Sequence, residues 1–327
     1  MAYGGWLLAA CIMAASSALS GCAIHPLPED VTGVPTHTIV RKIRCEARAG
    51  IKKNLVDWLR SYPAGSPEYK LGVDFATGAK PLSSFGTTVF PASVNGVIQK
   101  LRKSAIVYDF TLDMTEVDNV DAAIDLLNPF HKGTSSAALA AGVDRSRENS
   151  RSFTLSDTFE DLLVKTREDY CRGYEETEPN YLYPITGRIG IDEVVHSFVE
   201  LALFDNLAGS GGKTSGPPTM ADTITFTTKL SGSAAPKVVF TPSGTAAHVA
   251  DASITALASR TDVHKVIIGL ALPPTKAEEP HAPGPQPGLF ITVLGTPAQQ
   301  AAGQAIDQAY LRLGVTRPAG SILIPVP

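Results

Sequence analysis

The strongest structural signal in this chain of 327 residues is a strict alternation of apolar and polar residues over 106–115. Successive side chains of a β-strand point to opposite faces, so a period of two predicts a strand that is buried on one side. The apolar positions are Ile106, Tyr108, Phe110, Leu112 and Met114. The intervening aspartates and threonines are expected to face water, as is common in an antiparallel sheet.

Weaker alternation continues along the chain and predicts more strands. Residues 120–126, 137–143 and 152–156 follow the first strand, and together they predict a four-stranded antiparallel meander. A second set is predicted at 223–230, 237–241, 250–259 and 263–272, with Arg260-Thr261-Asp262 as a short hairpin connection between the last two. Further strands are expected at 289–294 and 321–326.

Helical patterns flank both sets of strands. The longest runs from Thr38 to about Arg60, and its apolar residues recur with a period near 3.6. Other helices are predicted at 94–103, from Asp157 toward Cys171, at 191–206, and from Pro297 to Gly314, whereas 62–92 is expected to be irregular. The fold class is therefore α+β, with antiparallel β meanders packed against amphipathic helices.

The outer face of the longest predicted helix is basic. It carries Arg41, Lys42, Arg44, Arg48, Lys52, Lys53 and Arg60. This face could lie on anionic lipid headgroups, or it could be the solvated face of a helix that packs on the core. We favour the solvated face.

The N-terminal residues have the pattern of an export signal. An uncharged apolar run from Trp6 to Leu19 has the length of a secretory core and is too short to span a bilayer. It ends in Leu19-Ser20-Gly21-Cys22, which resembles the lipobox of bacterial prolipoproteins. The alternatives are an ordinary cleaved signal and a buried N-terminal helix. No lysine or arginine precedes the run, which departs from the usual pattern.

The prolipoprotein resemblance implies where the protein is attached. It implies cleavage between Gly21 and Cys22, with acyl chains on the Cys22 sulfur and on its new amino group. The second mature residue is Ala23 and not aspartate, which in two-membrane bacteria implies the periplasmic face of the outer membrane. The mature region resembles no characterised family.

The same reading sets the expected domain organisation. Residues 1–21 form the signal peptide, 22–37 a flexible tether rich in proline, and 38–327 an α+β globular region. Within that region, sub-units at 38–208 and 219–327 and a proline-rich linker at 273–288 are expected.

Two cysteines remain after lipidation and loss of the leader. An exported protein folds where thiols are oxidised, so Cys45 and Cys171 are predicted to form a disulfide. Two free buried thiols or a metal site are the alternatives, but two cysteines without a neighbouring histidine make a poor metal site.

Composition and motifs favour a binding role over catalysis. The net charge of −4 argues against a nucleic-acid partner. Glu193 and His196 have the spacing of metal ligands on one helix, but no second such helix is found, so a solvated helix edge is favoured and no metal or cofactor is expected. His248 and His264 are predicted to lie far apart on one hairpin. No catalytic residues are assigned.

We therefore predict a periplasmic lipoprotein that binds an envelope partner, acts as a scaffold or supports the envelope without catalysis. The alternatives are a periplasmic hydrolase with a dispersed active site and a carrier of a small apolar ligand.

Overall fold

The computed structural model describes residues 25–130, 133–174, 178–207, 216–239, 248–274, 295–315 and 323–324. Within these residues the chain is α+β, as the sequence predicts. It divides into two compact units, each built from three segments. Unit 1 comprises 1–33, 114–149 and 229–262, and unit 2 comprises 34–113, 150–228 and 263–327. The sub-units expected at 38–208 and 219–327 therefore do not coincide with these two units.

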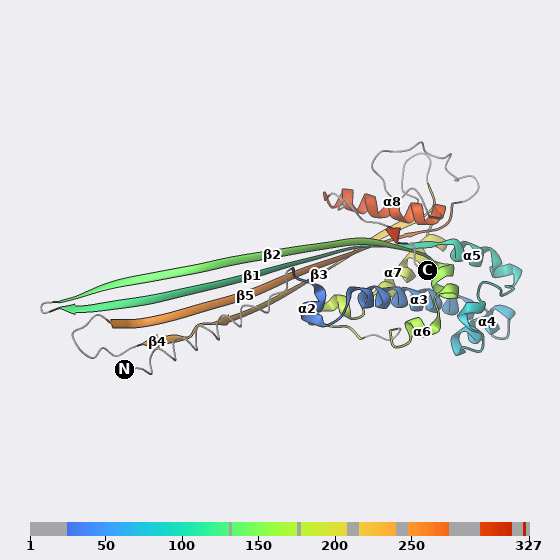
Figure 1. Ribbon diagram of the computed structural model, residues 1–327. Coiled ribbons are helices and arrows are strands. Elements are labelled where there is room, and N and C mark those ends of the chain that lie inside the picture. The colour runs from blue at the N-terminus through green and yellow to red at the C-terminus, as the bar shows by residue number, and fades with distance from the viewer. Residues whose placement is uncertain are drawn as a thin grey trace. The chain divides into compact units, whose positions relative to one another are not determined.

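Long strands contribute residues to both units. They are β1 (Ala105–Phe130), β2 (Gly133–Thr158), β3 (Thr219–Ala234) and β5 (His248–Ala271), accompanied by the short strands β4 (Lys237–Val239) and β6 (Leu323–Ile324) (Figure 1). The order is β3-β5-β1-β2-β6, and β4 pairs with β5. β6 pairs with β2 in parallel, so the C-terminal edge strand is confirmed.

β1 and β2 pair in antiparallel fashion. Ser150 donates to Asp113, and Thr154 donates to Asp109, so the partner residues run in opposite directions along the two strands. The predicted meander of four strands over 106–156 is therefore wrong in its connections, because two strands of 26 residues each replace it. The predicted hairpin at Arg260-Thr261-Asp262 is also wrong, since these residues lie inside β5.

The main predicted helices are confirmed. They are α3 (Thr36–Arg60), α5 (Ala92–Lys103), α7 (Ile191–Leu203) and α8 (Pro297–Arg312). Thr296 and Gln299 form a capping box at the start of α8, and α7 follows Gly190, whose φ of +87° suits glycine. None of the helices in the described part of the chain is long and apolar enough to cross a bilayer.

The segment expected to be irregular at 62–92 contains α4 (Pro67–Thr77) and a 3-10 turn, η2 (Leu82–Ser84). The Ser66 side chain caps α4 by accepting from the Tyr69 N–H, and Gly78 ends it with a φ of +76°. These local signals outweighed the weak apolar periodicity of the segment.

The helix predicted from Asp157 toward Cys171 is also corrected. β2 continues to Thr158, and a π-helical turn, η3 (Asp161–Lys165), precedes a short α6 (Glu168–Cys171). Thr158 and Asp161 form the reciprocal cap, each accepting from the backbone N–H of the other. Asp157 is instead the last carboxylate of the strand and makes a buried contact with α3. A further 3-10 turn, η4 (Pro184–Thr186), lies before α7.

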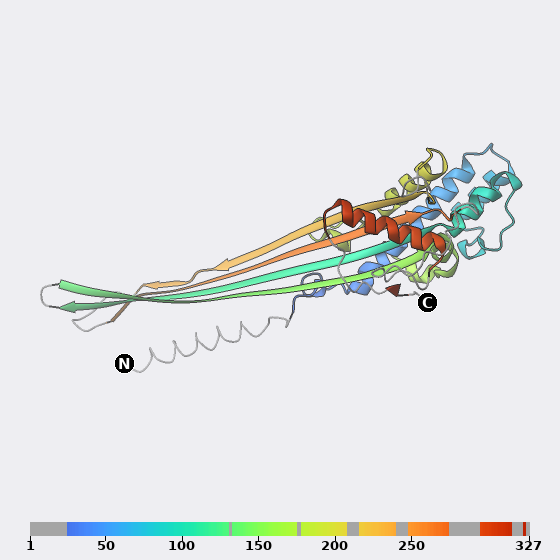
Figure 2. The same cartoon turned by 90° about the horizontal axis from the view of Figure 1, so that it is seen from above.

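In unit 2, helices cover both faces of the sheet. Figure 1 shows α8 on one face and α3 with α7 on the other, and Figure 2 shows α8 lying across the strands. The α8 layer buries a cluster of small and branched side chains comprising Ala105, Val107, Ile267, Ala271, Ala298, Ala301, Ala302, Ile306 and Tyr310.

The α8 layer overturns one expectation from the sequence. The polar face of β1 was expected to be wet, yet Asp109 is fully buried and Thr111 is nearly so. Tyr310 of α8 donates to one Asp109 oxygen and Thr154 of β2 donates to the other. Burial of the carboxylate is tolerated because both oxygens are hydrogen-bonded.

The opposite face of the sheet holds the larger core. Ile106, Tyr108, Phe110 and Leu112 of β1 are fully buried. α3 packs against α4 and α7 in the same unit. The apolar stripe predicted for α3 is confirmed, because Ile39, Ile43, Ala47, Ile51, Leu55 and Leu59 are buried.

Unit 1 contains strand segments and a short helix. The helix α2 (Pro28–Thr32) lies in 22–37, where no regular structure was expected, and Gly33 ends it with a φ of +63°. Arg260 of β5 donates to the Leu27 carbonyl, and Asn149 of β2 donates to the Pro26 carbonyl. These two hydrogen bonds attach the start of the described chain to the strands of unit 1.

Candidate functional site

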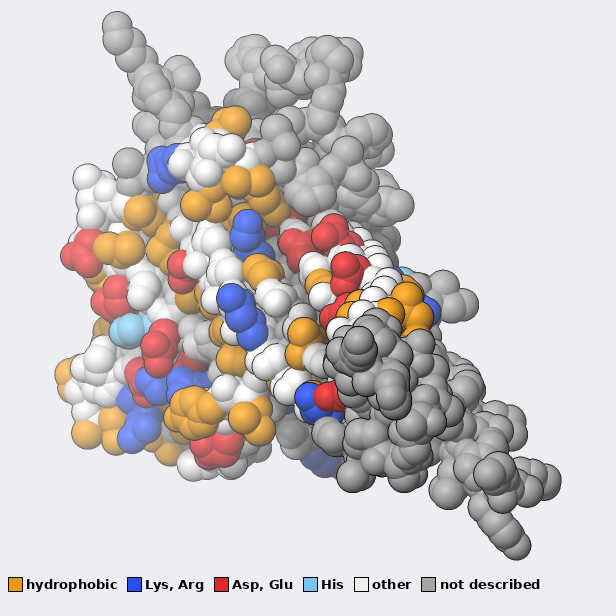
Figure 3. All heavy atoms as spheres, turned by 90° about the vertical axis from the view of Figure 1, so that its left-hand side faces the viewer, with side chains coloured by type: hydrophobic (Ala, Val, Ile, Leu, Met, Phe, Trp, Pro, Cys, Tyr) orange, Lys and Arg blue, Asp and Glu red, His pale blue; other side chains and the backbone are white. Residues whose placement is uncertain are grey.

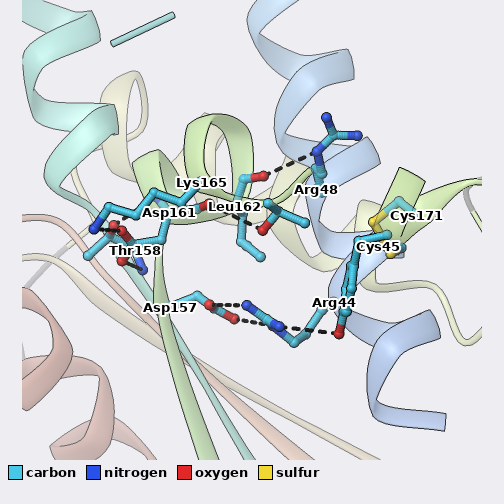
Figure 4. A network of polar contacts seen from close by, with 11 residues as sticks. Arg44, Cys45, Arg48, Asp157, Thr158, Asp161, Leu162, Lys165 and Cys171 are labelled. Carbon is cyan, nitrogen blue, oxygen red and sulfur yellow. Dashed lines mark hydrogen bonds and ion pairs between the residues drawn. A yellow bond between two sulfur atoms is a disulfide. The ribbon is translucent and has the colours of Figure 1, made fainter. Parts of the chain in front are cut away.

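A buried ion pair joins α3 to the end of β2 in unit 2. The Arg44 guanidinium donates to both carboxylate oxygens of Asp157, at 2.8 and 2.7 Å, and both side chains are almost fully buried (Figure 4). Burial raises the pKa of Asp157, and the bonds from Arg44 oppose this shift. Arg44 was predicted to lie on the solvated face of its helix. That assignment is wrong for this residue, because the carboxylate offsets the burial of its charge.

A second buried carboxylate holds the loop before α7. Glu46 accepts the backbone N–H groups of Ile189, Gly190 and Ile191 at 3.1, 2.6 and 2.8 Å. Burial raises the pKa of Glu46, and these three N–H donors work in the opposite direction. With its oxygens occupied by backbone donors, this carboxylate positions a loop.

The structure contains the expected disulfide between Cys45 and Cys171. Their Cα atoms lie 5.4 Å apart, and the bridge closes a sequence separation of 126 residues (Figure 4). Nearby, Arg48 of α3 donates to the Leu162 carbonyl of η3. The predicted lipidation and cleavage residues, Cys22 and Gly21, lie outside the described residues.

In unit 2, a buried histidine of β5 contacts the hydroxyl of a tyrosine. His264 is 1% exposed, and its Nε2 lies 2.5 Å from the Tyr183 hydroxyl. The predicted wide separation of His264 from His248 rested on a hairpin that the structure lacks, and the side chain of His248 lies outside the described residues. The Tyr183–His264 contact anchors the loop of η4 against β5.

The Glu193 and His196 pair does not face a common ligand. His196 Nδ1 lies 2.5 Å from Asn54 Oδ1 of α3, while Glu193 is exposed and lies 3.5 Å from Arg188. Across the described ranges, no group of three or more metal-ligating side chains converges.

A pocket of about 450 Å³ lies between α3, α7 and the core of unit 2. Its base is apolar, with Leu55, Phe85, Phe159 and Leu163, and its rim carries Asn54, Asp57, His196 and Glu200. This size is within the range of pockets that bind small molecules. Its chemistry suits an apolar molecule with one polar end.

Away from the contacts with α2 and the residues before it, the strands of unit 1 form a sheet that no described element covers. Along 115–126, 136–146, 229–237 and 251–259, not one side chain is buried. Large apolar side chains on these strands are exposed, including Ile124, Leu139, Val143, Leu230, Ile254 and Leu257. A sheet of ordinary globular type buries at least one face, so this one is exceptional.

The register places like residues of β1 and β2 on the same face. A Cβ atom on Gly142 of β2 would meet the carboxylate of Asp121, so these two residues lie opposite each other. In an antiparallel pair, Val120 then faces Val143, and Ile124 faces Leu139. The apolar residues of the two strands therefore share one face, and Asp121 and Asp125 lie on the other. Asp118 is the exception, since it lies on the face of Val120 and pairs with Arg147.

Strands β3, β4 and β5 follow the same division. On the polar face, Lys237 of β4 forms a 2.6 Å ion pair with Asp251 of β5, and this bond raises the pKa of Lys237. Asp125 of β1 also acts on Lys237 electrostatically. A groove on this face is lined by Asn119, Ser231, Ser233 and Ser259. Strands β1, β3, β4 and β5 therefore all contribute polar residues to one face.

The fold and these sites define an α+β protein with a disulfide-braced helical unit and an uncovered, two-faced sheet. The family model of the uncharacterised protein y4kA matches residues 25–288, and the chain belongs to this family. The "Uncharacterized protein y4kA" of Sinorhizobium fredii is 35% identical over 280 residues, which cover 82% of this chain and 84% of that protein.

Similarity to solved structures is weak. The InvG secretin domain of the Salmonella SPI-1 injectisome is 7% identical, covers 70% of this chain and 75% of its own, and has a TM-score of 0.24. The pilotin–secretin AspS–GspD complex of ETEC is 8% identical, covers 73% of this chain and 62% of its own, and has a TM-score of 0.25. Scores this low carry no argument about fold or function.

Proposed function

We propose that this protein is a lipid-anchored lipoprotein on the periplasmic face of the outer membrane, and that the uncovered sheet of unit 1 is its non-catalytic binding surface. The observation that carries the binding role is that no side chain is buried along 115–126, 136–146, 229–237 and 251–259, which are described strand segments of unit 1. Exposed contiguous apolar surface marks a contact with a partner or a membrane.

The disulfide supports export. Disulfides persist in oxidising compartments and are rare in the bacterial cytoplasm. Cys45 and Cys171 are both fully buried and bonded, as expected of a protein that folds in the periplasm. A lipid on Cys22 would hold the binding surface near a membrane and raise its effective concentration there.

The charge distribution fits a protein or lipid partner better than nucleic acid. Figure 3 shows acidic and basic side chains interspersed with apolar ones on the face drawn there. The net charge of −4 gives no basic excess for a phosphate backbone.

Cell fractionation of Cys22→Ser tests the anchor. We expect the variant to lose lipidation and to leave the membrane fraction, whereas Cys11→Ser, which changes a cysteine within the predicted leader, behaves as the wild type. If Cys22→Ser is processed and fractionates as the wild type does, the proposed lipid anchor and outer-membrane location are contradicted.

In-cell photo-crosslinking tests the binding surface. A photoreactive residue at Ile254 of β5 should give adducts with envelope components, while the same residue at Leu311 of α8, which is also exposed, should give few. Equal and negligible yields at both positions would contradict a binding role for the sheet.

The pocket of unit 2 favours a second candidate function, the carriage of a small apolar ligand. Its apolar base and polar rim support this role. Native mass spectrometry should then show a ligand copurifying with the wild type and lost from Val199→Trp, which fills the pocket, but kept by Leu311→Trp. A ligand-free wild type would count against it.

A further inference from the structure

The apolar face of the unit 1 sheet is free of charge along 120–126 of β1, 137–143 of β2, 230–234 of β3 and 252–258 of β5. Its positions in these stretches hold Val120, Ala122, Ile124 and Leu126 of β1, Ala137, Leu139, Ala141 and Val143 of β2, Leu230, Gly232 and Ala234 of β3, and Ala252, Ile254, Ala256 and Ala258 of β5. Outside these stretches the same face carries ion pairs, which join Arg147 to Glu116 and Asp118 and Arg260 to Asp262. The opposite face carries aspartates, serines and lysine. Alternation of this kind, apolar on one side and polar on the other with neither side covered, is typical of strands that contact lipid.

The length of the strands fits the hydrocarbon layer. β1 ends at Phe130, so its part from Val120 to Phe130 is eleven residues long. A tilted transmembrane strand needs about 9–11 residues. At about 3.4 Å per residue and a tilt of about 45°, this stretch rises about 24 Å, which matches the apolar band of roughly 25 Å in outer-membrane proteins.

Among the described residues, the sheet of one chain is open on both sides in unit 1. β2 lies at one edge there, since its pairing with β6 is confined to Thr154 and Leu155, which belong to unit 2. β3 and β4 lie beyond β5 at the other edge. Unpaired backbone groups are costly in hydrocarbon, so an open sheet is excluded from a bilayer unless its edges pair. Further copies of the chain would supply those edges.

The predicted lipid would bring the membrane to this unit. Pro26 is held by the hydrogen bond from Asn149 of β2, at 2.8 Å. Cys22 is four residues earlier, so it lies within about 14 Å of that point even if the chain is fully extended. The acyl chains would therefore enter the bilayer beside the strands of unit 1.

We propose that unit 1 inserts into the membrane, with the strands of several copies joined edge to edge into a closed sheet. The apolar face contacts lipid acyl chains, and the face with Asp121, Asp125, Lys237 and Asp251 surrounds a polar interior. This inference rests on the proposed function, because it names lipid and further copies of the chain as what the uncovered sheet binds.

Fluorescence quenching on the full lipidated chain, reconstituted in phosphatidylethanolamine and phosphatidylglycerol vesicles, tests lipid contact. Single cysteines at each position from 120 to 126 would carry a bimane label; the native cysteines are bonded or acylated. We expect nitroxide-labelled lipid to quench positions 120, 122, 124 and 126 more strongly, and aqueous iodide to quench 121, 123 and 125. Equal access of iodide to both faces overturns the proposal, as does shielding of the apolar face from both quenchers, which indicates a protein partner.

Two arginine substitutions on β5 form a matched pair. Ile254 and Leu257 are 46% and 45% exposed and lie on opposite faces. Ile254→Arg should reduce the fraction of protein that inserts into the vesicle membrane by about tenfold or more. Leu257→Arg should leave that fraction within about twofold of the wild type. Equal effects of the two substitutions would contradict insertion by the apolar face.

Edge pairing between copies is tested by disulfide formation between chains. A chain with cysteine at Ala140 of β2, mixed with one carrying cysteine at Ser233 of β3, should yield linked dimers in the membrane, unlike Ala140 mixed with Ser253, which lies on the interior strand β5. If both mixtures give only monomers, the proposed edge pairing between copies is wrong. These failures remain distinct from failure of the anchor, because the Cys22→Ser fractionation result does not depend on insertion.

Discussion

The guanidinium of Arg44 on α3 donates hydrogen bonds to both carboxylate oxygens of Asp157 at the end of β2. The two donor–acceptor distances are 2.8 and 2.7 Å, and the pair is buried. It thereby ties the longest helix of unit 2 to the sheet. Tyr170 adds its hydroxyl, which lies 3.3 Å from Arg44.

Removing one partner of this pair should cost more than removing both. Arg44→Met leaves the Asp157 carboxylate buried without its cation and is expected to lower the free energy of unfolding by about 3–5 kcal/mol. The double variant Arg44→Met/Asp157→Leu should lose clearly less. Urea unfolding followed by circular dichroism measures both, and a double variant that is the less stable of the two would contradict this account.

Glu46→Gln should loosen the loop before α7. The amide offers one acceptor oxygen and an NH₂ group where the carboxylate meets three backbone N–H donors. We expect a loss of about 1–3 kcal/mol in the free energy of unfolding. Glu193→Gln, at an exposed position of α7, is the matched control, and an equal loss in both would refute the role of Glu46.

Gly269→Ala should disturb the docking of α8. A Cβ atom at Gly269 of β5 would collide with the backbone carbonyl of Ala302. Overpacking of this kind costs about 1–3 kcal/mol. Gly232→Ala on β3, where nothing lies within 4 Å, should change the thermal midpoint little. Identical midpoints for the two variants would show that α8 is not so closely packed.

Asp161 should make part of the stability depend on pH. Partial burial works to raise its pKa, but hydrogen bonds from Lys165 and Thr158 outweigh burial, so the pKa is lowered in the folded protein. The stabilisation is therefore present above the unfolded pKa, near 3.9, and is lost as the pH falls through the lower folded value. Asp161→Asn, which keeps the cap acceptor and removes the ion pair with Lys165, should be about 0.2–1 kcal/mol less stable near pH 6, with the gap closing toward pH 3. A gap that is constant between pH 6 and pH 3 would contradict the shift.

The helices were predictable where local signals are strong. Thr296 and Pro297 mark the start of α8, and the apolar stripe from Ile39 to Leu59 marks α3. α4 was missed although Ser66 and Gly78 bracket it, because its apolar positions are few. The disulfide was predictable from the number of cysteines and the export signal.

The strands were predictable in place but not in length. Strands average five or six residues, so patterns that weaken along 106–156 were divided into four strands rather than two. Arg260-Thr261-Asp262 was predicted to be a hairpin connection between two alternating segments, yet Arg260 and Asp262 form a 2.8 Å ion pair within β5. Asp109 was expected to face water because the residue that covers it, Tyr310 of α8, lies 201 residues later in the chain.

The uncovered sheet could have been recognised from the sequence only in part. The alternation at 120–126 and 137–143 was visible, but alternation alone implies a buried apolar face. The register that aligns Asp121 with Gly142 and the lack of cover are properties of the three-dimensional structure.

Intact-mass analysis of the protein extracted from membranes tests the export and anchoring of this chain most directly. The account predicts the mass of residues 22–327 plus three acyl chains, the glyceryl group on sulfur, and two hydrogens fewer for the Cys45–Cys171 bridge. A mass equal to the unmodified chain from Met1, with no acyl groups and both thiols reduced, would contradict it.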